Sequence, residues 1–235
     1  MVTIRIAELN IGIRYKYQFT YDYVKEYITE QSPDFIVEAT EKDLENELSL
    51  AEEYLPNEYL EYAAIYRKIA DKITEYEGAV FHGAVLEVDG KAYLITARSG
   101  VGKTTHLHLW QKRYGDKVDI VNGDKPVLRV INGEIYACGT PWRGKEGYGK
   151  MVNRCLFGIA FLERAEKNSY SALSPSEAAV RFMGQIYMNR NDSAVILRTL
   201  RLSDKILSSV PLFEFKCNMD ISAAEMAYGA FIGNN

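Results

Sequence analysis

One stretch of this chain decides how the rest is arranged: Ile95-Thr96-Ala97-Arg98-Ser99-Gly100-Val101-Gly102-Lys103-Thr104-Thr105-His106. An apolar run over 92–96 precedes it and predicts a buried strand, and a helical pattern follows it. Gly100 and Gly102 allow positive φ and let an anion approach the backbone without a Cβ in the way. The N–H groups at the start of the helix then face that anion, where the helix dipole favours negative charge. The stretch therefore predicts a phosphate-binding loop.

The pattern G-x-x-x-x-G-K-[ST] assigns roles within this loop. Lys103 is expected to neutralise the β- and γ-phosphates of a nucleotide, and the Thr104 hydroxyl is expected to bind Mg²⁺. Ala97 stands where the pattern has glycine, and positive φ at an alanine would cost roughly 1 kcal/mol or more. The alternative, a glycine-containing loop that binds nothing, is disfavoured by the strand-to-helix context. The expected nucleotide contacts are Ser99, Gly100, Val101, Gly102, Lys103, Thr104 and Thr105.

The segments around the loop carry a family resemblance. Phe81-His82-Gly83-Ala84 lies upstream, Val121-Asn122-Gly123-Asp124-Lys125 lies downstream, and Gly139-Thr140-Pro141-Trp142-Arg143-Gly144-Lys145 follows. Over residues 78–165 this arrangement resembles the HPr kinase/phosphorylase family and the related ATP-dependent phosphoenolpyruvate carboxykinases. The resemblance implies an α/β P-loop kinase core with a mixed sheet, which uses a nucleotide and Mg²⁺ to phosphorylate a serine hydroxyl. It also implies that Asp124 serves as base and metal ligand, and that His82 corresponds to the histidine that this family has ahead of the loop.

Four side chains are the predicted catalytic groups, and each has a structural alternative. Asp124, at a predicted strand end, would bind Mg²⁺ or accept the hydroxyl proton, or it simply forms a turn. His82 would polarise the γ-phosphate or tune Asp124, or it is a hydrogen-bonded core residue. Arg143 and Lys145, in a glycine-rich loop, would reach the transferred phosphate, or they are solvated charges.

The glycine-rich loop also contains two aromatic residues. Trp142 and Tyr148 either anchor the loop in the core or flank the base of the nucleotide. The residues leave both interpretations open.

The chain divides into two predicted parts: a small N-terminal α+β lobe over 1–76 and the P-loop kinase core over 77–235. Alternating apolar residues predict one or two strands over 3–19, and helical spacing predicts a helix over 57–76. The core is expected to contain a strand over 79–88, hairpin turns at Asp89-Gly90 and Asn132-Gly133, and a helix from Ser174 to about Met188.

Composition restricts the class of protein. Of 235 residues, 47% are hydrophobic and 26% are charged, which predicts a soluble globular chain. Twenty-eight basic against 32 acidic residues give a net charge of −4, so neither nucleic acid nor an anionic membrane is an expected partner. No signal pattern and no apolar run near the roughly 20 residues of a membrane span is present. Cys138, Cys155 and Cys217 lie far apart and predict reduced thiols in the cytoplasm.

Three functions remain open. The first is an ATP/Mg²⁺-dependent kinase that acts on a hydroxyl-bearing protein, peptide or small molecule. The second is a nucleotide-binding switch without catalysis, and the third is a carboxykinase-like enzyme acting on a small organic acid. A homo-oligomer is compatible with each. HPr itself is not an expected substrate, because Gly123-Asp124 replaces the paired aspartates of that family.

Overall fold

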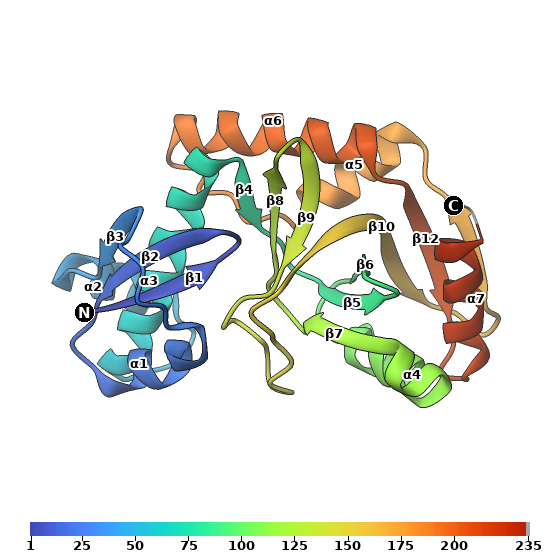
Figure 1. The fold of residues 1–235 in the computed structure, drawn as a ribbon, viewed down its shortest axis with the longest axis horizontal. Coiled ribbons are helices and arrows are strands. Elements are labelled where there is room, and N and C mark those ends of the chain that lie inside the picture. Colours follow the sequence, from blue (N-terminus) through green and yellow to red (C-terminus); the bar gives the residue numbers. More distant parts are fainter. Residues whose placement is uncertain (234–235) are drawn as a thin grey trace.

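The computed structural model describes residues 1–233 and contains two β-sheets with helices packed around them (Figure 1). A three-stranded sheet belongs to the N-terminal part, and a nine-stranded sheet belongs to the rest. The predicted mixed α/β class is confirmed. Its assignment to the HPr kinase and carboxykinase type, and the division into lobes at residue 76, stay predictions.

The small sheet has the order β1-β2-β3. Its strands are β1 (Val2–Ile6), β2 (Leu9–Arg14) and β3 (Phe35–Glu38), and β2 pairs antiparallel with β1 and parallel with β3. The helices of this part are α1 (Gln18–Val24), α2 (Glu41–Leu50) and α3 (Asn57–Lys72). Short 3-10 helices follow α1 at Lys25–Tyr27 and α3 at Ile73–Tyr76.

The prediction of one or two strands over 3–19 is confirmed as far as Arg14, where β2 ends, and is wrong beyond it, because the chain leaves the sheet there. Glu61 of α3, which is buried, explains the change of direction. Its carboxylate accepts the backbone N–H groups of Lys16 (2.6 Å) and Tyr17 (3.2 Å) and the Thr20 hydroxyl (2.7 Å). These contacts hold the segment where α1 begins, and a residue more than 40 positions away supplies them.

The large sheet has the order β4-β8-β9-β10-β6-β5-β7, with β12 beside β10 and β11 beside β12. Its strands are β4 (Gly78–Val80), β5 (Ala84–Val88), β6 (Lys91–Thr96), β7 (Val118–Asn122), β8 (Val127–Ile131), β9 (Glu134–Cys138), β10 (Asn153–Arg164), β11 (Ser169–Ala172) and β12 (Leu212–Cys217). Strands β6, β10 and β12 run parallel, so their carboxyl ends meet at one edge of the sheet. Ligands of open α/β sheets bind at such an edge.

Four helices cover the two faces of the large sheet: α4 (Lys103–Tyr114), α5 (Pro175–Met183), α6 (Ser193–Ser209) and α7 (Ser222–Ile232). A 3-10 helix, Gly115–Lys117, follows α4. Successive residues of β5 and β6 alternate between two apolar clusters, as the period of a strand requires. One cluster contains residues of α5 and α6, and the other contains residues of α4 and α7, so the sheet lies between two helical layers (Figure 1).

Both predicted hairpin turns are confirmed. Asp89 and Gly90 have φ of 49° and 78°, and Asn132 and Gly133 have φ of 52° and 88°, as a type I′ turn requires. The helix from Ser174 ends earlier than predicted, at Met183.

The predicted strand over 79–88 is wrong in one respect: it is two strands, β4 and β5, with Phe81, His82 and Gly83 between them. Backbone hydrogen bonds to distant segments explain the interruption. The N–H of His82 donates to the carbonyl oxygen of Gln185 at 2.8 Å, and that of Gly83 donates to the carbonyl oxygen of Asp124 at 2.9 Å. The interruption places His82 near the end of β7 and near Lys103, which follows the loop predicted to bind phosphate.

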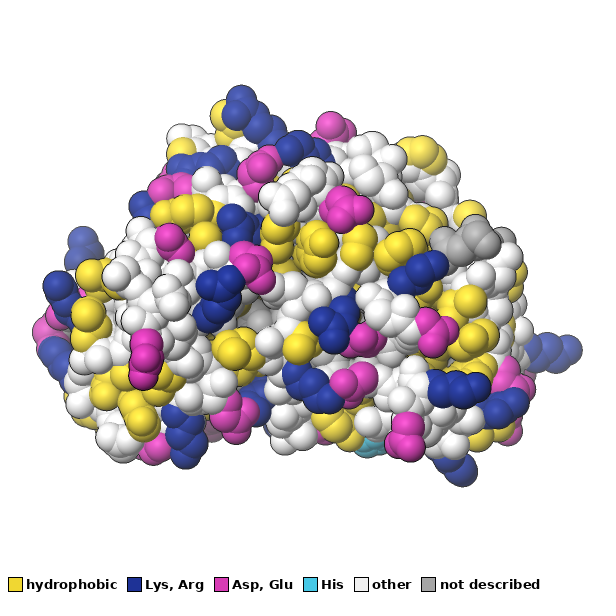
Figure 2. Space-filling model, in the orientation of Figure 1, with side chains coloured by type: hydrophobic (Ala, Val, Ile, Leu, Met, Phe, Trp, Pro, Cys, Tyr) yellow, Lys and Arg dark blue, Asp and Glu magenta, His cyan; other side chains and the backbone are white. Residues whose placement is uncertain are grey.

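The N-terminal part packs directly on the large sheet. One apolar cluster contains residues of β1, β2 and α3 together with Val127, Cys138 and Trp142. On the face shown in Figure 2, basic and acidic side chains are interspersed, without a broad area of one sign. Along residues 1–233, no helix combines the length and apolarity that crossing a bilayer requires.

Candidate functional site

The loop between β6 and α4 has the backbone that its glycines predict. Gly100 has φ of 78° and Gly102 has φ of 121°, so both lie in the left-handed region that favours glycine. Ala97 has no positive φ, and the predicted strain at this position is therefore wrong. Ala97 is instead buried within the apolar cluster that contains Leu107 and Trp110. Its methyl group packs in the core where the pattern has glycine.

The N-terminus of α4 is open to an anion. Gly102 occupies the N-cap position and supplies no side-chain hydrogen bond, and the first turn contains no acidic residue. The first turn of a helix has N–H groups without partners inside the helix. Thr104 and Thr105 lie half-buried in that turn, while Ser99 and Gly100 are exposed in the loop. This arrangement suits a phosphate group.

Lys103, His82 and Asp124 come together at this helix start, although they belong to three separate segments. Lys103 Nζ lies 3.0 Å from His82 Nε2 and 3.4 Å from the carbonyl oxygen of Ala97. His82 Nε2 lies 3.6 Å from Asp124 Oδ1. The other carboxylate oxygen, Asp124 Oδ2, accepts a hydrogen bond from Lys125 Nζ at 2.6 Å. Three of the predicted groups thus form one cluster.

Asp124 is held by a turn that begins at the end of β7. The side-chain oxygen of Asn122, which is buried, accepts the backbone N–H groups of Asp124 (2.9 Å) and Lys125 (2.8 Å). Asparagine favours this kind of local turn. A Cβ at Gly144 would lie 3.1 Å from the Cβ of Asp124, so the glycine-rich loop lies against the same aspartate.

The protonation states within the cluster follow from burial and neighbouring charge. Burial lowers the pKa of His82, and the Lys103 ammonium lowers it further, so the ring is neutral at pH 7. Burial also lowers the pKa of Lys103, while the Asp124 carboxylate opposes that shift. The Lys103 ammonium can only donate, so His82 Nε2 accepts, and the ring proton is on Nδ1. That proton is donated to Gln185 Oε1, which lies 3.0 Å away.

The side chains of the glycine-rich loop make their contacts away from Lys103. The Arg143 guanidinium forms an ion pair with Glu26 of the N-terminal part at 2.6 Å, and Lys145 is exposed. Trp142 is buried against Tyr66, with ring centroids 4.8 Å apart, so it anchors the loop. Tyr148 donates or accepts a hydrogen bond with His108 at 3.1 Å. Arg143 and Lys145 therefore lie outside the Lys103, His82 and Asp124 cluster in this structure.

Sequence reasoning missed Arg164, the last residue of β10. Its Nε donates to the carbonyl oxygen of Val101 at 2.9 Å, and its Nη2 donates to that of Gly100 at 2.6 Å. Both loop carbonyl groups thus receive a hydrogen bond from a different strand, and these bonds support the loop conformation. Only the parallel register of β6 and β10, which pairs Thr96 with Phe161, brings Arg164 to the loop.

Comparisons with known proteins add little. No protein-family model and no curated protein matches the chain. Among solved structures, the chain is similar to the Hpr(Ser) kinase/phosphatase from Coxiella burnetii, with 13% sequence identity and a TM-score of 0.38. The match covers 66% of this chain and 92% of the other. A likeness of this degree identifies neither an activity nor a substrate.

Proposed function

We propose that this chain is an ATP/Mg²⁺-dependent kinase that transfers the γ-phosphoryl group to a serine-type hydroxyl of a protein, peptide or small molecule. One observation carries the proposal: Lys103, His82 and Asp124 converge at the open N-terminus of α4. Phosphoryl transfer needs positioning, charge neutralisation and a group that accepts the hydroxyl proton. The cluster and the helix start offer each of these.

The residues fit a magnesium-bound nucleotide. Gly100 and Gly102 both have positive φ, and a Cβ added at Gly100 would have nothing within 4 Å, which leaves room for an approaching phosphate. Thr104 would hold Mg²⁺ directly and Asp124 would hold it through a bound water, because this ion keeps several waters and takes only one or two protein ligands together with substrate phosphates. Mg²⁺ would supply charge neutralisation on the phosphates. Within residues 1–233 no group of three or more His, Cys, Asp or Glu side chains forms a metal site.

The chain's own groups divide the work of transfer. Lys103 binds the β- and γ-phosphates, for which it must exchange its contact with His82 for phosphate oxygens. Asp124 Oδ2 stays paired with Lys125, which leaves Oδ1, the oxygen facing His82, to accept the proton of the acceptor hydroxyl. Neutral His82 positions Lys103 before the nucleotide binds, because its Nε2 accepts a hydrogen bond from the Lys103 ammonium. Removing the proton as the oxygen attacks contributes typically 10²–10⁴-fold to the rate.

A second function, a nucleotide-binding switch, is favoured by the Asp124–Lys125 ion pair. An ammonium at 2.6 Å occupies one oxygen of the carboxylate on which catalysis depends. The ion pair between Arg143 and Glu26 also connects the glycine-rich loop to the N-terminal part. A nucleotide that altered this loop would change that contact without any chemistry.

Transfer of label from γ-labelled ATP decides between the two functions. The purified chain and its Lys103→Ala variant would each be incubated with Mg²⁺, γ-labelled ATP and a cell extract. A partner that is labelled by the wild type and not by the variant supports the kinase. Nucleotide binding by the wild type without any labelled partner or released phosphate overturns the kinase and leaves the switch.

A further inference from the structure

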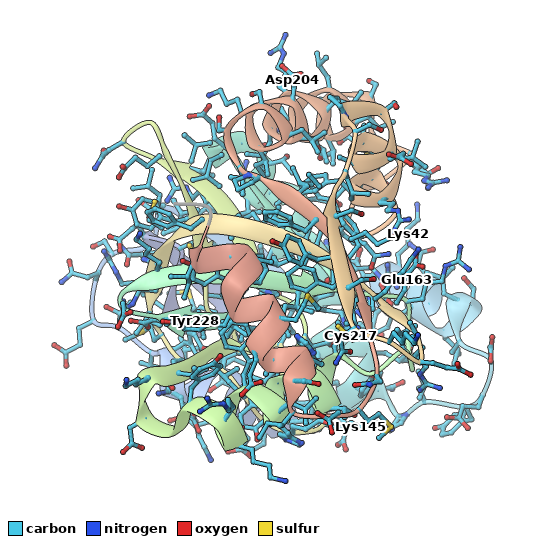
Figure 3. The ribbon with its side chains drawn as sticks, turned by 90° about the vertical axis from the view of Figure 1, so that its right-hand side faces the viewer. Lys42, Lys145, Glu163, Asp204, Cys217 and Tyr228 are labelled. Carbon is cyan, nitrogen blue, oxygen red and sulfur yellow. The ribbon has the colours of Figure 1, made fainter. Side chains whose placement is uncertain are left out.

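A cavity of about 450 Å³ lies beside the predicted phosphate-binding loop, and neither His82 nor Asp124 is among the residues that line it. The start of α4 and the carboxyl ends of β10 and β12 form its walls, and Figure 3 labels Glu163 and Cys217, which line it. Its lining is largely apolar and includes Val101, Leu109, Leu162 and Met219. The volume falls within the roughly 300–1,000 Å³ of pockets that bind small molecules.

His106 lines this cavity and carries a buried donor without a partner. Its side chain is only 2% exposed, and its Nε2 accepts the indole N–H of Trp110 at 3.2 Å. Burial lowers the pKa of His106 to about 4, so the ring is neutral and its single proton is on Nδ1. Among the described residues, nothing forms a hydrogen bond with Nδ1. A buried donor without a partner is unfavourable, and a ligand acceptor would relieve that cost.

We infer that this cavity is the nucleobase site of the protein and that His106 Nδ1–H donates to a ring nitrogen or carbonyl oxygen of the base. The inference rests on the proposed nucleotide-dependent function. Gly102 and Thr105 line the cavity and also belong to the phosphate-binding loop and helix start, so the two sites are continuous. The flat faces of the base pack against Val101 and Leu162, and His106 at the first turn of α4 selects for an acceptor at the edge of the base.

A second cavity beside the loop, of about 800 Å³, suits the base less well. Arg98, Arg181 and Gln185 line it, and the polar groups of Arg181 and Gln185 already have protein partners. The Arg181 guanidinium contacts Glu163 at 3.0 Å and Glu214 at 2.6 Å, and Gln185 Oε1 accepts from His82. Gln185 connects this second cavity to the His82 cluster. The cavity therefore lies where the acceptor hydroxyl would enter.

Paired titrations test the inference, with Mg-ATP and inorganic triphosphate as probes. His106→Phe keeps a ring but loses the donor, so it is expected to weaken Mg-ATP binding about tenfold or more, because one hydrogen bond to a buried donor is lost. Triphosphate, which has no base, is expected to bind the variant and the wild type within about twofold. His106→Gln, which keeps a donor and an acceptor for Trp110, is expected to recover part of the ATP affinity. Equal effects on both probes, or no effect on either, would overturn the base site.

Nitrogen-15 spectra of His106 keep the test independent of how well the variants fold. In the wild-type protein the ring is expected to be the neutral Nδ1–H form, and Mg-ATP is expected to shift the Nδ1 resonance while triphosphate leaves it in place. A proton found on Nε2, or no shift with Mg-ATP, contradicts the inference. Failure of the proposed function itself looks different: Lys103→Ala would then leave the affinity for both probes unchanged.

Discussion

The starts of helices α2 and α5 differ from the start of α4. Thr40 and Asp43 form a capping box at α2, and Ser174 and Glu177 form another at α5, each with both reciprocal hydrogen bonds. At α4 the cap is Gly102, without a side-chain bond and without an acidic residue in the first turn. The capping boxes satisfy N–H groups at the starts of α2 and α5, whereas no side chain caps the start of α4. Helices α1, α3 and α7 also lack a side-chain cap, so it is the glycine loop and the Lys103 cluster at α4 that support the proposed nucleotide binding there.

The surroundings of the helix starts follow the same division. The caps of α2 and α5 are exposed and local in sequence, since each box spans four residues. The start of α4 instead collects Lys103, His82 and Asp124 from segments more than 20 residues apart. Local sequence therefore suffices for a stabilising cap, while the binding start depends on the assembled sheet.

The largest expected effect concerns catalysis at the open helix start. Asp124→Asn keeps the shape of the side chain but removes its charge, so phosphoryl transfer is expected to fall by roughly 10²-fold or more, while Mg-ATP affinity changes far less. Asp119→Asn is the matched control, because Asp119 lies on β7, is exposed and pairs with Lys150. Release of labelled phosphate measures the rate. Wild-type turnover in Asp124→Asn would remove this residue from the mechanism.

A smaller effect is expected from the loop glycines. Gly100 and Gly90 both have φ of 78° and open space around an added Cβ, but only Gly100 lies in the phosphate-binding loop. Each alanine variant is expected to lose roughly 1–2 kcal/mol of stability. Only Gly100→Ala should also weaken Mg-ATP binding, on the order of fivefold or more. Calorimetry of both variants checks this. Equal nucleotide affinities would mean that Gly100 plays no part in binding the phosphates.

Variants of the capping boxes are expected to lose stability without losing affinity for Mg-ATP. Thr40→Ala and Ser174→Ala are each expected to lower the free energy of unfolding by about 1 kcal/mol, because a first-turn N–H loses its acceptor. Neither should alter Mg-ATP affinity. Urea denaturation measures the first quantity and calorimetry the second. A change in nucleotide affinity in either variant would contradict the separation of the two kinds of helix start.

The smallest effect is expected at Ala97. Because Ala97 is buried and has no positive φ, Ala97→Gly removes a packed methyl group and adds freedom to the unfolded chain. The expected loss of stability is about 0.4–1 kcal/mol. Thermal unfolding would detect it, and a stabilised variant would show that the backbone at this position is strained after all.

Whether a structural feature could be predicted from the sequence depends on how far apart in the sequence the residues that form it lie. Glycines at positive φ, the Asp89-Gly90 turn and the Ser174 helix start are local signals, and the structure confirms them. The interruption between β4 and β5 was missed because it depends on hydrogen bonds to Asp124 and Gln185. Such partners become neighbours only when the sheet assembles.

The candidate site shows the same limit. The approach of Asp124 to Lys103 could be predicted, since strand ends beside a phosphate-binding loop lie close together. The Arg164 contacts to the loop carbonyls could not, because they require the register between β6 and β10. The Arg143 contact with Glu26 also escaped prediction, since no pattern connects the glycine-rich loop to the helices of the N-terminal part.

Calorimetric titration of Mg-ATP into the wild type, Lys103→Ala and Lys42→Ala tests the central claim most directly. Lys42 is an exposed lysine near the start of the capped helix α2, so it is the matched control for Lys103 at the open start of α4. The wild type and Lys42→Ala are expected to bind Mg-ATP equally. Lys103→Ala is expected to bind it roughly 10–150-fold more weakly, because hydrogen bonds to charged groups contribute about 1.5–3 kcal/mol. A folded Lys103→Ala protein with wild-type affinity would contradict the assignment of α4 as the nucleotide-binding helix start.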